Sequence, residues 1–178
     1  MGRVLEKLLG GDLRSIGNAD EVVSDILKDP TLFDEVFYGM MNDNPLIRMR
    51  SADVIEKVSR LHPEYLKPYK VPLIKEVAKI EQQEVRWHVA LLFSYLDLDD
   101  EEKQQIVEEL FSWIDNSKSK IVKVNSMQAL AKIGEKNKKM RPLIVNKLEE
   151  AIKNGSPAMV SRGKKLINKL KKLEGKDN

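Results

Sequence analysis

Hydrophobic and polar positions repeat along this chain in a twelve-residue pattern that occurs four times. Each copy opens with an apolar residue, usually has a basic residue second, and is apolar again at positions eight, nine and twelve. The copies begin at Ile47, Val85, Val122 and Met159, so their starts lie 38, 37 and 37 residues apart. The apolar positions of each copy fall on one face of a helix. This period, with a helix in every unit, predicts stacked helix pairs.

Turn and capping signals divide the chain into about ten helices, and no segment is typical of a strand. Gly10-Gly11 is a stop signal, and Asn44-Pro45 and Ser156-Pro157 each place a capping side chain before a proline at the first helical position. Gly155 is expected in a left-handed C-cap. The expected helices are 2–9, 19–28, 32–42, 45–61, an irregular segment ending near Ile80, 84–97, 100–115, 119–134, 141–153 and 157–173.

The four copies resemble HEAT repeats, over about residues 31–173. The second helix of a HEAT repeat opens with Val-Arg, and the matching pairs here are Ile47-Arg48, Val85-Arg86, Val122-Lys123 and Met159-Val160. The resemblance implies an all-α, right-handed α-solenoid of about four helix pairs. We expect the chain to form a single domain, 1–178, with N-terminal capping helices in 1–30, repeats in 31–173 and a frayed tail in 174–178. The segments DNPLIRMRSAD and QQEVRWHVA are also similar to a small bacterial group of HEAT-repeat proteins without assigned activity.

Composition excludes several classes of chemistry. The chain has no cysteine, which excludes disulfides, thiolate metal sites and cysteine nucleophiles. The N-terminus has too short an apolar run for a secretory signal, and no stretch approaches the roughly 18 apolar residues of a membrane span. We therefore expect a cytoplasmic protein.

Charge is distributed very unevenly around the net value of +3. Residues 1–44 carry a net −5 and residues 83–118 a net −6, whereas residues 45–82 carry +3. Residues 119–178 hold sixteen basic and five acidic side chains. An anionic partner would therefore meet the last two helix pairs first.

The resemblance also implies where a partner would bind, because the second helices of HEAT-like arrays line the concave side. Their outward positions are expected to form a basic strip in which Asp53 is the one acid, paired with Arg50 or Lys57. Trp87 has an alternative role, packing between adjacent repeats. The predicted partner-binding residues are Arg50, Lys57, Trp87, His88, Tyr95, Lys132, Arg162, Lys165 and Lys169. In the family, the basic residue near the start of the helix bonds groups in the turns between helices, and Arg48, Arg86 and Lys123 hold this structural position.

Enzymatic chemistry finds little support in the sequence. Two histidines without cysteines disfavour a metal site, and the acidic run 97–102 lacks the glycine and the ligand spacing of a calcium loop. No glycine-rich nucleotide loop is present. Asp53 could serve as the groove carboxylate of an enzyme that excises alkylated nucleobases. An ion pair with the basic side chain of Arg50 or Lys57 explains Asp53 better. We expect no catalytic residue, no metal and no cofactor.

These observations predict a non-enzymatic scaffold that engages a partner protein through the concave face of its second helices. The alternative is nucleic-acid (polyanion) binding through the basic C-terminal half and the concave basic strip. We favour the protein because aromatic residues make up only 6% of the chain. They also do not alternate with basic residues along several repeats, as a stacking surface for bases would require.

Overall fold

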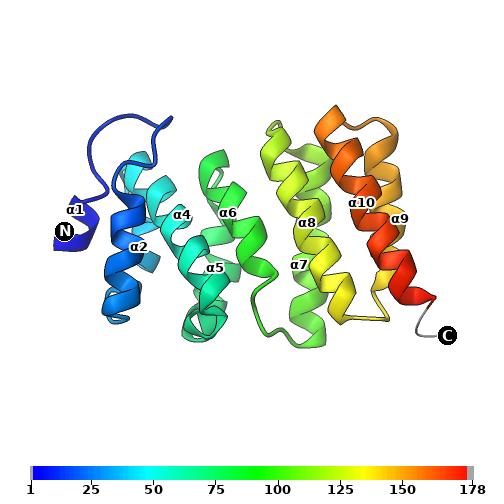
Figure 1. The fold of residues 1–178 in the computed structure, drawn as a ribbon, viewed down its shortest axis with the longest axis horizontal. Coiled ribbons are helices and arrows are strands. Elements are labelled where there is room, and N and C mark those ends of the chain that lie inside the picture. The colour runs from blue at the N-terminus through cyan, green and yellow to red at the C-terminus, as the bar shows by residue number, and fades with distance from the viewer. Residues whose placement is uncertain (1, 176–178) are drawn as a thin grey trace. The chain divides into compact units, whose positions relative to one another are not determined.

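The structure, a computed structural model, describes residues 2–175. Within these residues it contains ten α-helices, two short 3₁₀ segments and no strand, which confirms the all-α prediction. The chain divides into two compact units, residues 1–97 and residues 98–178 (Figure 1). The prediction of one domain stays a prediction.

The first unit is organised around its longest helix, α4 (Pro45–Leu61), which packs on α2, α3, η1 and α6. Ala52, Val54, Ile55 and Val58 are completely buried and form the centre of this core. The other elements of the unit are α1 (Arg3–Glu6), α2 (Ala19–Lys28), α3 (Leu32–Gly39), η1 (Pro63–Tyr69), α5 (Lys70–Lys75), η2 (Val77–Lys79) and α6 (Gln83–Phe93).

Local chemistry explains where these helices begin and end. The α4 helix begins as predicted, because the Asn44 side chain accepts a hydrogen bond from the Leu46 N–H at 2.9 Å and Pro45 takes the first helical position. The predicted helix 84–97 is too long, since α6 ends at Phe93. The Ser94 N–H donates a hydrogen bond to the Leu91 carbonyl, three residues earlier. The Ser94 hydroxyl donates to the same carbonyl at 2.7 Å. A tight i,i−3 turn of this kind closes a helix rather than continuing it.

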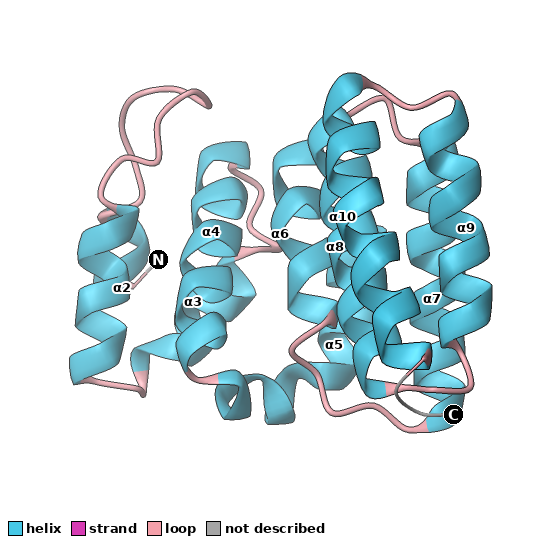
Figure 2. Cartoon of the chain, turned by 45° about the vertical axis from the view of Figure 1, so that its right-hand side comes forward, coloured by secondary structure: helices cyan, strands magenta, loops and turns pink. Residues whose placement is uncertain are grey.

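The second unit consists of four helices: α7 (Asp100–Asn116), α8 (Lys120–Lys136), α9 (Arg141–Lys153) and α10 (Pro157–Glu174). Helix α8 packs on α7, α9 and α10, and α10 also packs on α9. Figure 2 shows α8 and α10 side by side, with α7 and α9 forming the other layer of this unit. The core between the layers includes Ile106, Leu110, Leu130, Ile144 and Leu148.

Side-chain caps fix the helix starts of the second unit. Asp99 and Glu102 form a capping box, with hydrogen bonds of 2.8 and 2.9 Å to each other's backbone N–H. Ser119 and Ser156 cap α8 and α10 through their hydroxyls, which accept hydrogen bonds from the Val122 and Met159 N–H groups. The predicted Ser156 cap is confirmed.

Gly155, between α9 and α10, corrects one prediction. Among the described residues, positive φ angles occur at Gly10, Gly11 and Gly17 but not at Gly155, so the left-handed C-cap expected there is wrong. The boundary itself is confirmed, because α9 ends at Lys153 and α10 starts at Pro157. A Cβ at position 155 would lie 2.7 Å from the Ala151 carbonyl oxygen, so the turn needs glycine for space rather than for handedness.

Two further observations concern the helices and the end of the chain. None of the helices within residues 2–175 combines the length and the apolar content needed to cross a bilayer. The frayed tail predicted for 174–178 falls at residues 176–178 outside the described part, while Glu174 closes α10.

Candidate functional site

A polar cluster lies where α4 packs beside α2 and α6 in the first unit. Its centre is Asp53 on α4, whose side chain is almost buried. The Lys57 ammonium, one turn further along, lies 2.8 Å from Asp53 and 2.7 Å from Asp20 of α2. Burial opposes the charged form, but the hydrogen bonds to Asp20 and Asp53 outweigh it and raise the pKa of Lys57. Lys57 therefore holds two carboxylates together and stays charged.

His88 approaches the same carboxylate from α6. Its Nε2 lies 4.0 Å from Asp53 Oδ1, beyond hydrogen-bond range. Burial lowers the pKa of His88 more than the neighbouring Asp53 and Glu56 carboxylates raise it. The imidazole is consequently neutral near pH 7. If it were protonated, Asp53 would be the nearest carboxylate.

Tyr95, just beyond the end of α6, binds a second buried carboxylate. Its hydroxyl donates a hydrogen bond of 2.7 Å to Glu56 Oε1, and Glu56 is only 6% exposed. Burial, together with this bond to Glu56, raises the pKa of Tyr95 well above its ordinary value. The phenol therefore stays protonated and acts as a donor that links α6 to α4.

The structure thus brings three predicted residues, Lys57, His88 and Tyr95, around the carboxylates Asp53 and Glu56. The sequence indicated the pair Asp53 and Lys57 through its i,i+4 spacing. Glu56 was missed, because its position in the repeat corresponds to Ser94, Ala131 and Asn168, which suggest no charge. These contacts are internal, so they fix how α2, α4 and α6 lie against one another.

Arg50 does not face outward, which corrects its predicted place on the binding face. The side chain is fully buried beneath the loop that follows α1. Its guanidinium donates to four backbone carbonyls of that loop, at distances between 2.6 and 3.2 Å: those of Leu8, Gly10, Asp12 and Ser15. The periodic pattern gave no indication of this loop folding back over α4, so its position could not be predicted.

Two of the three residues predicted to be structural, Arg48 and Lys123, contact backbone carbonyls at or beside the turns between helices. Arg48 donates to the carbonyls of Asn42 and Asp43 in the turn before α4, and to the Gln82 side chain at 2.7 Å. Lys123 contacts the Asp115 carbonyl at the end of α7. Arg86 and Trp87, neighbours on α6, are both half-buried.

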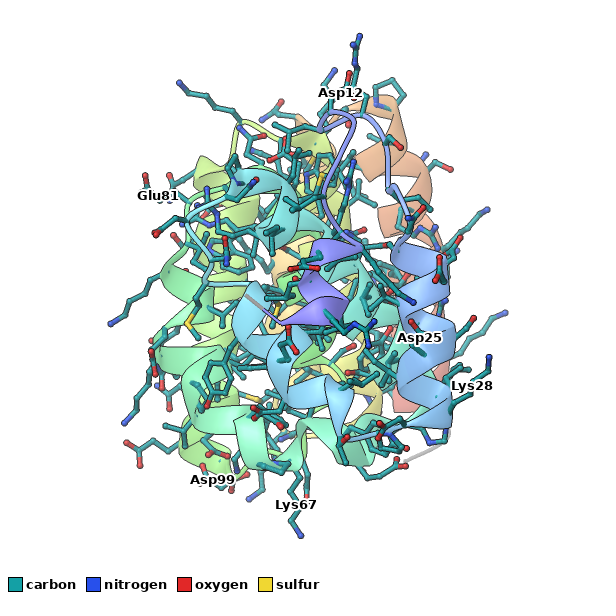
Figure 3. All side chains as sticks on the ribbon, turned by 90° about the vertical axis from the view of Figure 1, so that its left-hand side faces the viewer. Asp12, Asp25, Lys28, Lys67, Glu81 and Asp99 are labelled. Carbon is teal, nitrogen blue, oxygen red and sulfur yellow. The ribbon has the colours of Figure 1, made fainter. Side chains whose placement is uncertain are left out.

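A pocket of about 370 Å³ opens beside Tyr95 at the end of α6. Two of its charged groups, Glu64 and Lys70, have partners within the unit. Glu64 lies 3.0 Å from the His62 ring, and the Lys70 ammonium contacts the Asp97 carbonyl. Lys67 also lines the pocket, and Figure 3 shows its side chain extending away from the ribbon.

In the second unit, the side-by-side helices α8 and α10 form a different kind of face. Arg162 of α10 donates to the Gln128 side chain of α8 at 3.3 Å, and Lys169 pairs with Glu135 at 2.7 Å. Arg162, Lys165 and Lys169 are exposed, whereas Lys132 on α8 is half-buried. The C-terminal members of the predicted strip thus lie on two packed helices, while in the first unit Arg50 is buried and Lys57 is paired with two carboxylates.

The environment of His88 predicts a pH dependence of stability. The pKa of His88 in the folded protein lies below 6.5, so the unfolded chain takes up this proton first as the pH falls. We expect the free energy of unfolding to decrease as the pH drops from 7.5 through 6.5 towards 5. Denaturant titrations should show a smaller decrease in His88→Asn than in the wild type. Equal slopes for wild type and His88→Asn would contradict this assignment.

Within residues 2–175, no three His, Asp or Glu side chains gather closely enough to hold a metal ion. Comparison of the chain with protein-family models, curated proteins and solved structures found no match.

Proposed function

We propose that the chain is a HEAT-like α-solenoid that acts as a non-enzymatic, cytoplasmic scaffold and binds a partner protein through its second helices. The repeated anchors support the comparison with HEAT repeats. Ile47, Val85, Val122 and Met159 are all buried, and each lies in the first turn of α4, α6, α8 or α10. The same position thus performs the same packing role in four helices, as expected for one repeated unit.

The proposed binding function rests on the surface that α8 and α10 form together. Two contacts between the helices, Arg162 to Gln128 and Lys169 to Glu135, order side chains that also reach solvent. A surface already held in place loses less entropy on binding than a mobile one. The first unit supports a scaffold rather than an enzyme, because Lys57 and Tyr95 are engaged with buried carboxylates.

Nucleic-acid binding is the second candidate, favoured by the sixteen basic residues of segment 119–178. Two features of the second unit make it the weaker one. Trp113 is buried in the core, so it offers no stacking surface. The start of α7 carries Asp99, Asp100, Glu101 and Glu102 in succession, which would repel a long polyanion passing over it.

Site-specific photo-crosslinking in cells tests the function. The crosslinking residue replaces Ala158, which is exposed on α10, or Leu143, which is 52% exposed on α9 and serves as the control. We expect a protein adduct at position 158 that is absent at position 143 and that persists when the lysate is treated with nuclease. An adduct at position 158 that nuclease removes would support the nucleic-acid candidate instead.

A further inference from the structure

Helix α10 carries four basic side chains in a single outward stripe. Arg162, Lys165, Lys169 and Lys172 follow at steps of three, four and three residues, which places them on one face of the helix. All four are exposed. With a rise of about 1.5 Å per residue, the stripe extends roughly 15 Å along the axis. It therefore presents one cation at each turn of the helix.

The opposite side of α10 explains why this stripe points outward. Met159, Gly163, Leu166, Ile167 and Leu170 are buried there, where α10 packs on α8 and α9. Rotating the helix to cover the basic stripe would expose this apolar face. The direction of the four cations is consequently fixed by the core of the unit.

Helix α8 extends the basic stripe and holds part of it in place. Gln128 and Glu135 contact Arg162 and Lys169, and Lys132 lies between these two α8 positions on the same side of its helix. The face thus contains five basic side chains and one carboxylate, Glu135. Because Glu135 pairs with Lys169, the exposed Lys165 and Lys172 give the face capacity for anionic groups from a partner.

We infer that the stripe on α10 binds an acidic helical segment of the partner, with carboxylates on one face at the same spacing of one per turn. This inference rests on the proposed scaffold function and adds the chemistry of the partner. Two helices share the same rise, so each carboxylate of an acidic helix can face one cation of α10. Charge complementarity of this kind sets the register and speeds association.

The test uses a designed peptide helix, fixed by a side-chain staple, with glutamates at positions i, i+3, i+7 and i+10. A control peptide has the same composition and staple, but its glutamates are distributed around the helix. Binding of both to the full-length chain is measured by fluorescence anisotropy at two salt concentrations. We expect the striped peptide to bind at least ten times more tightly than the control and to weaken as salt rises.

Matched double variants locate the binding site on the protein. Lys165→Glu/Lys172→Glu changes the stripe at side chains exposed to solvent, and we expect it to weaken the striped peptide by more than tenfold. Lys118→Glu/Lys153→Glu makes the same change in net charge at exposed positions outside α10, and should leave binding within twofold. Circular dichroism melts confirm that both variants remain folded.

Three outcomes would overturn the inference. The first is equal binding of the two peptides, and the second is equal weakening of the striped peptide by the two double variants. The third is a generic DNA duplex that binds more tightly than the striped peptide and that loses binding only in Lys165→Glu/Lys172→Glu. If the striped peptide does not bind but the protein adduct at position 158 is still observed, the acidic-helix partner is rejected and the scaffold function stands. Loss of both signals would reject both.

Discussion

Arg50→Ala is expected to destabilise the first unit by roughly 3 kcal/mol, the upper range for hydrogen bonds made by a charged group. The substitution removes donors from four carbonyls at once and leaves a cavity beneath the loop that follows α1. The loop packs tightly around the guanidinium. Gly17 has a φ of 53°, and a Cβ there would lie 2.8 Å from Arg50. We therefore expect the loop to lose its ordered conformation while α4 remains helical.

Hydrogen exchange and denaturant titration measure these two effects. Backbone amides of residues 9–17 should exchange much faster in Arg50→Ala, and low-millimolar guanidinium should partly restore their protection by occupying the vacated site. Arg50→Lys should recover only part of the stability, because one ammonium cannot reach four carbonyls in different directions. Arg14→Ala is the control, since its side chain is 90% exposed and pairs only locally with Asp12. Unchanged exchange in Arg50→Ala would contradict the role assigned to this residue.

Phe93→Ala is expected to cost about 3–5 kcal/mol, the range for a large aromatic residue deleted from a packed core. The Phe93 side chain is only 1% exposed at the end of α6. Its removal leaves a cavity that the surrounding helices can close only in part. Val71→Ala, at a side chain 54% exposed in the same unit, should change stability by less than about 0.5 kcal/mol. A loss below about 1 kcal/mol for Phe93→Ala would argue against this core.

The two tryptophans allow the same experiment to test the prediction of one domain. Trp87 lies in the first unit and Trp113 in the second. Single-tryptophan variants, made with Trp87→Phe or Trp113→Phe, report the unfolding of each unit separately. If the units share one cooperative core, Phe93→Ala will shift both fluorescence transitions by the same amount. A shift confined to Trp87 would contradict the single-domain prediction.

The sequence by itself determined most of the helices and several of their caps, because these depend on interactions between residues close together in the chain. The range 45–61 follows from Asn44, Pro45 and the apolar period, and the structure contains that helix. Asp99 and Glu102 likewise form their capping box within one turn. The anchors Ile47, Val85, Val122 and Met159 are buried as the repeated pattern requires. Periodicity also indicated that Arg162, Lys165 and Lys169 face outward.

Only the tertiary structure decided which outward positions are exposed and which are covered. The periodic pattern places both Arg50 and Lys57 on the outward side of α4. A loop from residues 8–15 nevertheless covers Arg50, and Lys57 forms ion pairs with two carboxylates. Glu56 becomes part of the cluster only because the Tyr95 hydroxyl lies against it, 39 residues along the chain. Apart from the Asp53–Lys57 pair, which its i,i+4 spacing indicated, these contacts join residues distant in sequence. Periodicity within one helix carries no information about them, whereas the packing of neighbouring elements fixes them completely.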